Sequence, residues 1–225
     1  MNAHRFFSGQ EKSLIEQASS DAEKRTSAEI VCAVATESGR YDRAESICGL
    51  IVALAALALV NITGTEPSES GMWTVGQGCS LGWQSLAVVL GFIAGSTVAS
   101  CCHSVRRLLV REKEMKEETE RAASHVFAMQ RVCSTRTRGG LLIYLSLFEK
   151  RVVVLADDGI LKACDRNFTV QVRDIALKQL AAGKHTASFT DSIRTAAEHL
   201  TRVLPVEKDD ADELSNRLLI FHPRP

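Results

Sequence analysis

Two long stretches of this sequence, residues 46–62 and 83–102, contain no Asp, Glu, Lys or Arg. At about 1.5 Å of rise per helical residue, the first stretch reaches about 25 Å and the second about 30 Å, close to the ~30 Å hydrocarbon core of a bilayer. A soluble fold of this length rarely contains two helices so apolar on every side. We therefore predict a two-helix transmembrane hairpin over residues 44–103.

Basic residues indicate how this hairpin is oriented. Arg40 and Arg43 precede the first apolar stretch, and Arg106, Arg107 and Arg111 follow the second. The connecting segment 63–80 contains no Lys or Arg, and basic residues collect on the cytoplasmic side of membrane proteins. We expect a multi-pass protein of the inner or plasma membrane with both termini in the cytoplasm. Residues 1–45 are polar, which excludes a signal peptide before the first helix.

Small residues recur every four positions in the second stretch, at Ala87, Gly91, Gly95 and Ala99. Such spacing allows another helix backbone to approach closely. The partner is either the first apolar helix, a second copy of the chain or a helix of another membrane protein. Neither stretch contains an ionisable residue inside the span, so we do not expect ion or proton transport.

The composition argues against several other classes of protein. The 27 basic and 27 acidic side chains balance, so nothing predicts a nucleic-acid partner. The seven cysteines are never spaced as C-x-x-C, which indicates neither a disulfide framework nor a zinc site. Cys101, Cys102 and His103 are adjacent, but neighbouring residues of a helix point in different directions and do not easily share one metal ion.

The remaining sequence predicts a soluble α/β domain that the hairpin interrupts. We expect an amphipathic helix over 8–25 and a strand over 28–35, followed after the hairpin by a long helix that continues the second span through residues 103–132. Apolar runs predict two strands over 141–147 and 151–156, and periodic residues predict helices near 168–183 and 189–204. Together these elements indicate a three-layer α/β/α sandwich on a small mixed sheet. Its two parts are residues 1–43 and 104–204, and residues 205–225 form an acidic tail.

The strand–turn–strand segment from Arg138 to Asp165 resembles the core of the TPM domain, a family that includes a thylakoid lumen protein, a photosystem II repair protein and a nematode acetylcholine-receptor modulator. The resemblance extends over Thr26–Val31 and through the C-terminal helices to Pro205, and the acidic segment Asp209–Leu214 is similar to tails of bacterial relatives. It implies a four-stranded α/β/α domain with an accessory role at membranes. For plant members it also implies acid phosphatase activity with calcium binding.

Asp157, Asp158 and Arg138 are the residues most suited to such an activity. The two carboxylates end a strand at a Gly turn and could hold Ca²⁺ or Mg²⁺, and Arg138 could bind an anion if its loop lies at the same edge of the sheet. Asp and Gly are equally ordinary turn residues. No catalytic motif predicts a nucleophile, so the catalytic residues are unknown. The sequence therefore leaves two hypotheses: a non-enzymatic interaction or assembly module for membrane proteins, and a divalent-metal-dependent phosphatase using Asp157 and Asp158.

Overall fold

The computed structural model describes residues 2–63, 79–135, 138–206 and 214–225. They divide into two compact units, one made of Met1–Gly39 with Lys113–Pro225 and the other of Arg40–Glu112. The connection between the two apolar helices and the acids at 207–213 fall largely or wholly outside the described residues. We describe each unit by itself.

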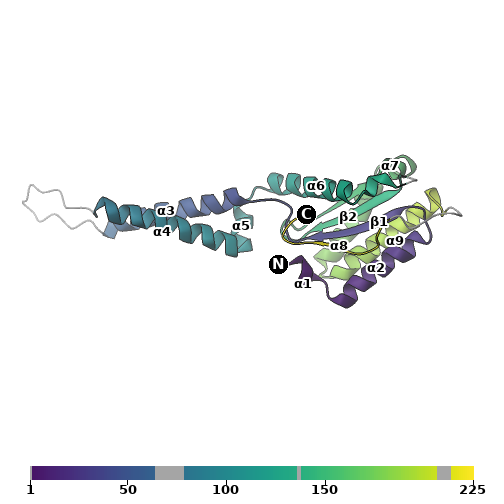
Figure 1. Ribbon diagram of the computed structural model, residues 1–225, viewed down its shortest axis with the longest axis horizontal. Coiled ribbons are helices and arrows are strands. Elements are labelled where there is room, and N and C mark those ends of the chain that lie inside the picture. Colours follow the sequence, from purple (N-terminus) through teal and green to yellow (C-terminus); the bar gives the residue numbers. More distant parts are fainter. Residues whose placement is uncertain (1, 64–78, 136–137, 207–213) are drawn as a thin grey trace, which may run out of the picture. The chain divides into compact units, whose positions relative to one another are not determined.

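The first unit is built on a four-stranded mixed sheet with the order β3-β2-β1-β4 (Figure 1). Its strands are β1 (Glu29–Ala35), β2 (Gly140–Ser146), β3 (Arg151–Ala156) and β4 (Leu219–Phe221). β1 pairs in parallel with β2 and with β4, whereas β2 and β3 form an antiparallel hairpin. The α/β class and the mixed sheet are as the sequence predicts.

The helices of this unit are α1 (Ala3–Phe6), α2 (Gly9–Glu23), α6 (Glu112–Met129), α7 (Asp158–Ala163), α8 (Phe168–Ala181) and α9 (His185–Val203), with a short 3₁₀ turn, η1 (Val132–Ser134). α2 begins with a capping box, in which the Ser8 hydroxyl accepts from the amide of Glu11 and the Glu11 carboxylate accepts from the amide of Ser8.

Alternate residues of β1 and β2 contribute to two separate apolar clusters, because successive side chains of a strand point to opposite faces. Ile30, Cys32 and Val34 pack in one cluster with Ile143 and with side chains of α2, α8 and α9. On the other face, Val31, Ala33 and Ala35 pack with Leu142, Tyr144 and the α6 residues Ala122, Ala123 and Val126. Both central strands are therefore buried on both faces, which explains their continuous apolar sequence.

β4 lies inside the segment 205–225, for which the sequence suggested only an acidic tail. Its three residues are too few to give a periodic signal, and the strand exists because β1 offers a free edge for pairing at Ala33, Val34 and Ala35.

The second unit consists of α3 (Asp42–Thr63), α4 (Leu81–Cys101) and α5 (His103–Leu109). Both α3 and α4 are long and apolar enough to cross a membrane by length and composition. α3 begins four residues earlier than the apolar pattern indicates, because Asp42 and Glu45 in its first turn suit the positive end of the helix dipole.

The prediction of one continuous helix from the second span through residue 132 is wrong. Cys102 and Val110 both have extended backbone, with φ and ψ of −100° and 95° and of −86° and 132°, so α4, α5 and α6 are three separate helices. The interleaved charges at 103–132 fit a helical pattern throughout, but side-chain periodicity carries no information about breaks of one or two residues.

Candidate functional site

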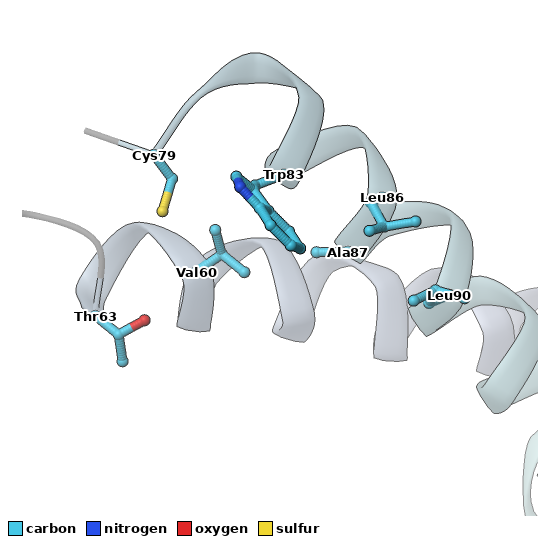
Figure 2. A pocket seen from close by; sticks show the side chains of 7 residues that line it. All are labelled: Val60, Thr63, Cys79, Trp83, Leu86, Ala87 and Leu90. Atoms are coloured by element: carbon cyan, nitrogen blue, oxygen red, sulfur yellow. The ribbon is translucent and has the colours of Figure 1, made fainter. Parts of the chain in front are cut away.

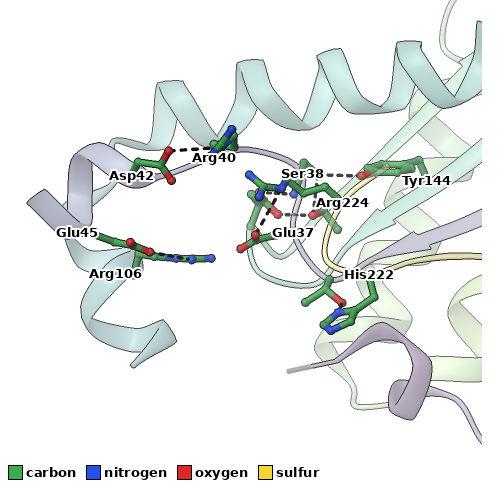
Figure 3. A network of polar contacts seen from close by, with 12 residues as sticks. Glu37, Ser38, Arg40, Asp42, Glu45, Arg106, Tyr144, His222 and Arg224 are labelled. Carbon is green, nitrogen blue, oxygen red and sulfur yellow. Dashed lines mark hydrogen bonds and ion pairs between the residues drawn. The ribbon is translucent and has the colours of Figure 1, made fainter. Parts of the chain in front are cut away.

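The carboxyl ends of the three parallel strands meet at one edge of the sheet, the place where open α/β sheets commonly bind ligands. Thr36, Glu37 and Ser38 follow β1, Leu147 to Lys150 follow β2, and His222 to Arg224 follow β4. Polar side chains at these strand ends form hydrogen bonds and an ion pair with one another, which we call the Glu149 network (Figure 3). No sequence pattern indicates this network, because its members come from segments that lie more than 70 residues apart and match no motif.

Glu149 lies at the centre of this network and is only 2% exposed. Its carboxylate accepts hydrogen bonds from the Ser38 amide, at 2.8 Å, and from the Ser146 hydroxyl. The Ser38 hydroxyl donates to Ser146 Oγ at 2.8 Å and lies 3.0 Å from the hydroxyl of Tyr144. A buried carboxylate is stable only when hydrogen bonds replace its lost water, and these donors supply them.

Burial raises the pKa of Tyr144, the hydrogen bond with Ser38 opposes that shift, and the nearby charge of Glu149 raises the pKa further. Tyr144 therefore stays protonated at neutral pH. Because the Ser38 hydroxyl is the donor to Ser146, the Tyr144 hydroxyl is the donor to Ser38. A fully hydrogen-bonded buried network of this kind rigidifies its surroundings.

The rim of the network holds both chain ends against β1. Thr36 Oγ1 lies 2.9 Å from His222 Nδ1 and accepts from the amide of Ala3 at 2.9 Å. Arg224 forms an ion pair with Glu37, with 3.7 Å between Nε and Oε1. The chain leaves the sheet unit one residue after Ser38, at Gly39. The geometry therefore makes this network an anchor for the end of β1 rather than an exposed reaction centre.

The structure brings together the three residues that the sequence singled out for metal or anion binding. Asp157 is the N-cap of α7, where its Oδ1 accepts from the Asp158 amide at 2.7 Å. Asp158 Oδ2 lies 3.8 Å from a terminal guanidinium nitrogen of Arg138, and both side chains are more than 60% exposed. The Asp157 amide donates to the carbonyl of Gly140, and the Gly159 amide donates to that of Arg138. These bonds are the turn chemistry that Asp and Gly residues commonly provide.

One carboxylate oxygen of this turn, Asp157 Oδ2, is buried and has no hydrogen-bond partner in the structure. Calcium takes six to eight oxygen ligands and magnesium six. Among the described residues, no group of three or more His, Cys, Asp and Glu side chains is close enough to hold a metal ion. Arg138 already pairs with Asp158, which leaves its guanidinium less available to an anion.

The small residues of α4 lie against α3. A Cβ atom added at Gly91 would come 2.9 Å from Ala53 Cα, and one added at Gly95 would come 2.8 Å from the carbonyl oxygen of Cys48. Ala99 is fully buried. Only glycine at positions 91 and 95 lets the two backbones approach this closely.

Ala87, nearer the other end of α4, lines a cavity of about 390 Å³ together with Trp83, Leu86 and Leu90 of α4 and Val60 and Thr63 of α3. Figure 2 shows the Trp83 indole lying between the two helices, near Val60. The indole therefore reports on the packing of α3 against α4.

The opposite end of the helix pair contains a partly buried ion pair. Arg106 of α5 lies 3.4 Å from Glu45 of α3 (Figure 3). Its guanidinium also lies over the ring of Tyr41, 5.9 Å from the centroid. The Ser96 hydroxyl donates to the carbonyl of Glu45 at 3.4 Å. These contacts fix the charged start of α3 against α4 and α5.

Comparison with known proteins gives a likeness at the level of fold. No protein-family model matches the chain, and no curated protein does so significantly. The chain is similar to the NMR structure of the BA42 protein from the psychrophilic bacterium Bizionia argentinensis, with a TM-score of 0.57 and 20% sequence identity over 96% of each chain. At this identity the likeness concerns the fold alone.

Proposed function

We propose that this chain is a membrane-anchored, TPM-like protein whose cytoplasmic α/β unit is a non-enzymatic interaction or assembly module for membrane proteins. In this proposal α3 and α4 cross an inner or plasma membrane as a hairpin, with both chain ends in the cytoplasm. In this proposal α6 covers one face of the sheet, and α2, α8 and α9 cover the other. The result is a three-layer α/β/α sandwich.

The observation that carries the proposal is the apolar surface of α3 and α4. Among the 18 most apolar consecutive residues of each helix, only 11% are buried in α3 and 17% in α4. The core helix of a soluble protein would be mostly buried instead. Large apolar side chains are exposed on all free sides of the pair, at Ile47, Leu50, Ile51, Leu54, Leu59, Ile62, Leu86, Val89, Leu90, Phe92, Ile93 and Val98. A contiguous surface of this kind requires a bilayer or a protein partner.

Helix length and end chemistry agree with a bilayer. The 22 residues of α3 and 21 of α4 extend about 33 and 32 Å, enough for a ~30 Å core. Glu45 and Arg106 pair at one end beside Tyr41, where charged and aromatic side chains suit the headgroup region.

The sheet supports the same-side placement of both hairpin ends. β1 precedes α3 and β2 follows α4, yet the two strands pair directly along seven residues. A chain that crossed the membrane once between them would leave these strands on opposite sides. An even number of crossings is therefore needed, as a hairpin provides.

Cysteine labelling in sealed cells tests this placement. Single-cysteine variants that retain Cys79, next to the start of α4, or the exposed Cys133 of the sheet unit would be treated with a membrane-impermeant maleimide. We expect Cys79 to react from outside and Cys133 to react only after the membrane is opened. Reaction of Cys133 in intact cells would overturn the proposed orientation.

Site-specific photo-crosslinking tests the module function. A crosslinking amino acid at the exposed positions Leu54 of α3 or Ile93 of α4 should give discrete protein adducts in native membranes, because both side chains face outward. Differently tagged copies distinguish a homodimer from a foreign partner. Leu161 of α7 serves as the matched exposed control in the other unit. Adducts to lipid alone from every outward position of both helices would contradict an assembly role for the hairpin.

The second candidate, a divalent-metal-dependent phosphatase, is favoured by one observation: the buried Oδ2 of Asp157 has no hydrogen-bond partner. Calorimetric titration of Ca²⁺ and Mg²⁺ into the wild type and Asp157→Asn tests it. Saturable binding that the substitution removes would justify a phosphatase screen, and no binding to folded protein would leave the interaction module.

A further inference from the structure

A second cavity lies within the sheet unit, at the end of β2 and next to the buried Glu149 network. It has a volume of about 520 Å³ and is bounded by α1, the end of β2 with the following turn, the last turns of α8 and the first residue of α9. This volume falls within the range of small-molecule binding sites. Neither the anchor network nor the proposed interaction role uses it.

The walls are mainly apolar. Phe6, Leu177 and Leu180 line one side, and Leu145 and Leu147 line the side toward the sheet. Leu177 is 37% exposed, so an apolar surface here is open to solvent in the structure. Such walls suit a hydrocarbon chain and disfavour a sugar or nucleotide, whose polar groups would lose water without gaining partners.

Three polar side chains also line the cavity, and they differ in what they can offer a ligand. The Ser146 hydroxyl is already engaged with Ser38 and Glu149. Lys150 is exposed and carries the only formal positive charge on the wall. His185 is held against Phe6 by a ring contact of 4.5 Å between centroids, and its Nδ1 is buried with no hydrogen-bond partner in the structure.

No carboxylate lines this cavity among the described residues. Glu11 lies near His185, but its two oxygens accept hydrogen bonds from the Ser8 amide and the Thr186 hydroxyl, both at 2.8 Å. Lys150 is therefore the charged group that lines the cavity and is available to a ligand, and the other lining residues are mainly apolar.

We propose that this cavity binds a single-chain amphiphile with a carboxylate head, such as a medium-chain fatty acid. The alkyl chain lies against Phe6, Leu177 and Leu180, and the carboxylate lies beside Lys150. A charge-assisted hydrogen bond from the Lys150 ammonium gives the head group its selectivity. The inference does not depend on the interaction role proposed above, since every wall residue belongs to the sheet unit.

Titration calorimetry on the full chain in phosphatidylcholine nanodiscs tests this proposal, with empty nanodiscs as the reference. The probe is octanoate, and acetate and octan-1-ol are compared with it as a head without a chain and a chain without a charge. We expect saturable octanoate binding, no acetate binding and at least tenfold weaker binding of octan-1-ol.

Three variants test which residues recognise the probe. Lys150 has a φ of 53°, a conformation that Asn tolerates well, so Lys150→Asn removes the charge without backbone strain. We expect about fivefold weaker octanoate binding, and no change in Lys162→Gln, an exposed lysine of α7 away from the cavity. Ala181→Trp, at an exposed position on the rim, should fill the mouth and abolish binding.

Octanoate heats equal to those of empty nanodiscs would overturn the proposal. Equal affinity for octanoate and octan-1-ol, together with unchanged binding in Lys150→Asn, would overturn the assignment of an anionic head. Loss of binding in Lys162→Gln would show that net charge, rather than this site, attracts the probe.

Discussion

Gly95→Ala should weaken the packing of α3 against α4, although the same change normally stabilises a helix. The new methyl group would lie 2.8 Å from the Cys48 carbonyl oxygen and 2.9 Å from Gly49 Cα. Both are backbone atoms, which cannot rotate away, so the helices must separate. Overpacking of this kind costs about 1–3 kcal/mol.

Gly82→Ala is the matched control, because it makes the same change in the same helix. A Cβ atom there would meet only the Ser80 hydroxyl oxygen, at 3.9 Å. At either position, replacing Gly with Ala stabilises the helix by up to about 1 kcal/mol through its higher helix propensity. The difference between the two variants therefore isolates the helix–helix contact, and we expect Gly95→Ala to be the less stable by about 1–3 kcal/mol.

The intensity and wavelength of Trp83 fluorescence measure this difference, since the indole lies between α3 and α4 (Figure 2). Both variants would be made in a Trp73→Phe background, which leaves Trp83 as the single tryptophan. The helix pair would then be titrated with dodecyl sulfate in mixed micelles. Equal stabilisation by Gly95→Ala and Gly82→Ala would refute the close approach of the two backbones.

Four further predictions concern the sheet unit. Glu149→Gln should lower the free energy of unfolding by about 1–3 kcal/mol, because a neutral amide replaces a buried carboxylate that accepts two hydrogen bonds; an unchanged thermal midpoint by circular dichroism would show that the network is dispensable. Burial raises the pKa of Cys32 to about 12, so iodoacetamide at pH 8 should modify the exposed Cys133 and spare Cys32. The Cys32 thiol ionises near pH 9 in the unfolded chain and only near pH 12 in the folded one. The free energy of unfolding therefore keeps the full contribution of this group below about pH 9 and falls by about 1.4 kcal/mol per pH unit above it. This decrease with pH should be shallower in Cys32→Ala. Gly140→Ala should prevent stable folding, since a Cβ atom would overlap the Val132 carbonyl oxygen, and native-like near-ultraviolet dichroism in that variant would contradict the structure.

Several elements were predictable because their signals are local. Uncharged apolar runs predicted the positions of α3 and α4, and the Ser8 to Glu11 pattern predicted the start of α2. Short apolar runs predicted β1, β2 and β3. Each of these signals comes from residues within one or two helical turns or within one strand. Contacts with distant parts of the chain therefore do not alter it.

The candidate site was not predictable in the same way. Asp157, Asp158 and Arg138 are close in space, as their positions at strand ends suggested, but their bonds are those of a helix cap and an exposed ion pair. The Glu149 network was not predicted, because its Ser, Glu and Tyr residues match no sequence motif. They come together only where the strand ends meet in the fold.

The sequence by itself determined two apolar helices and an α/β unit interrupted by them, whereas the same-side hairpin that its charges favour stays a prediction. Hydrophobicity and periodicity are properties of residues that neighbour one another in the sequence, so they can be evaluated without knowing the fold. Only the tertiary structure decided that β4 pairs with β1, that Cys102 and Val110 break the helix after α4, and that Lys150 and His185 share one cavity wall. These features depend on contacts between residues distant in the chain or on single backbone angles, neither of which a local pattern contains.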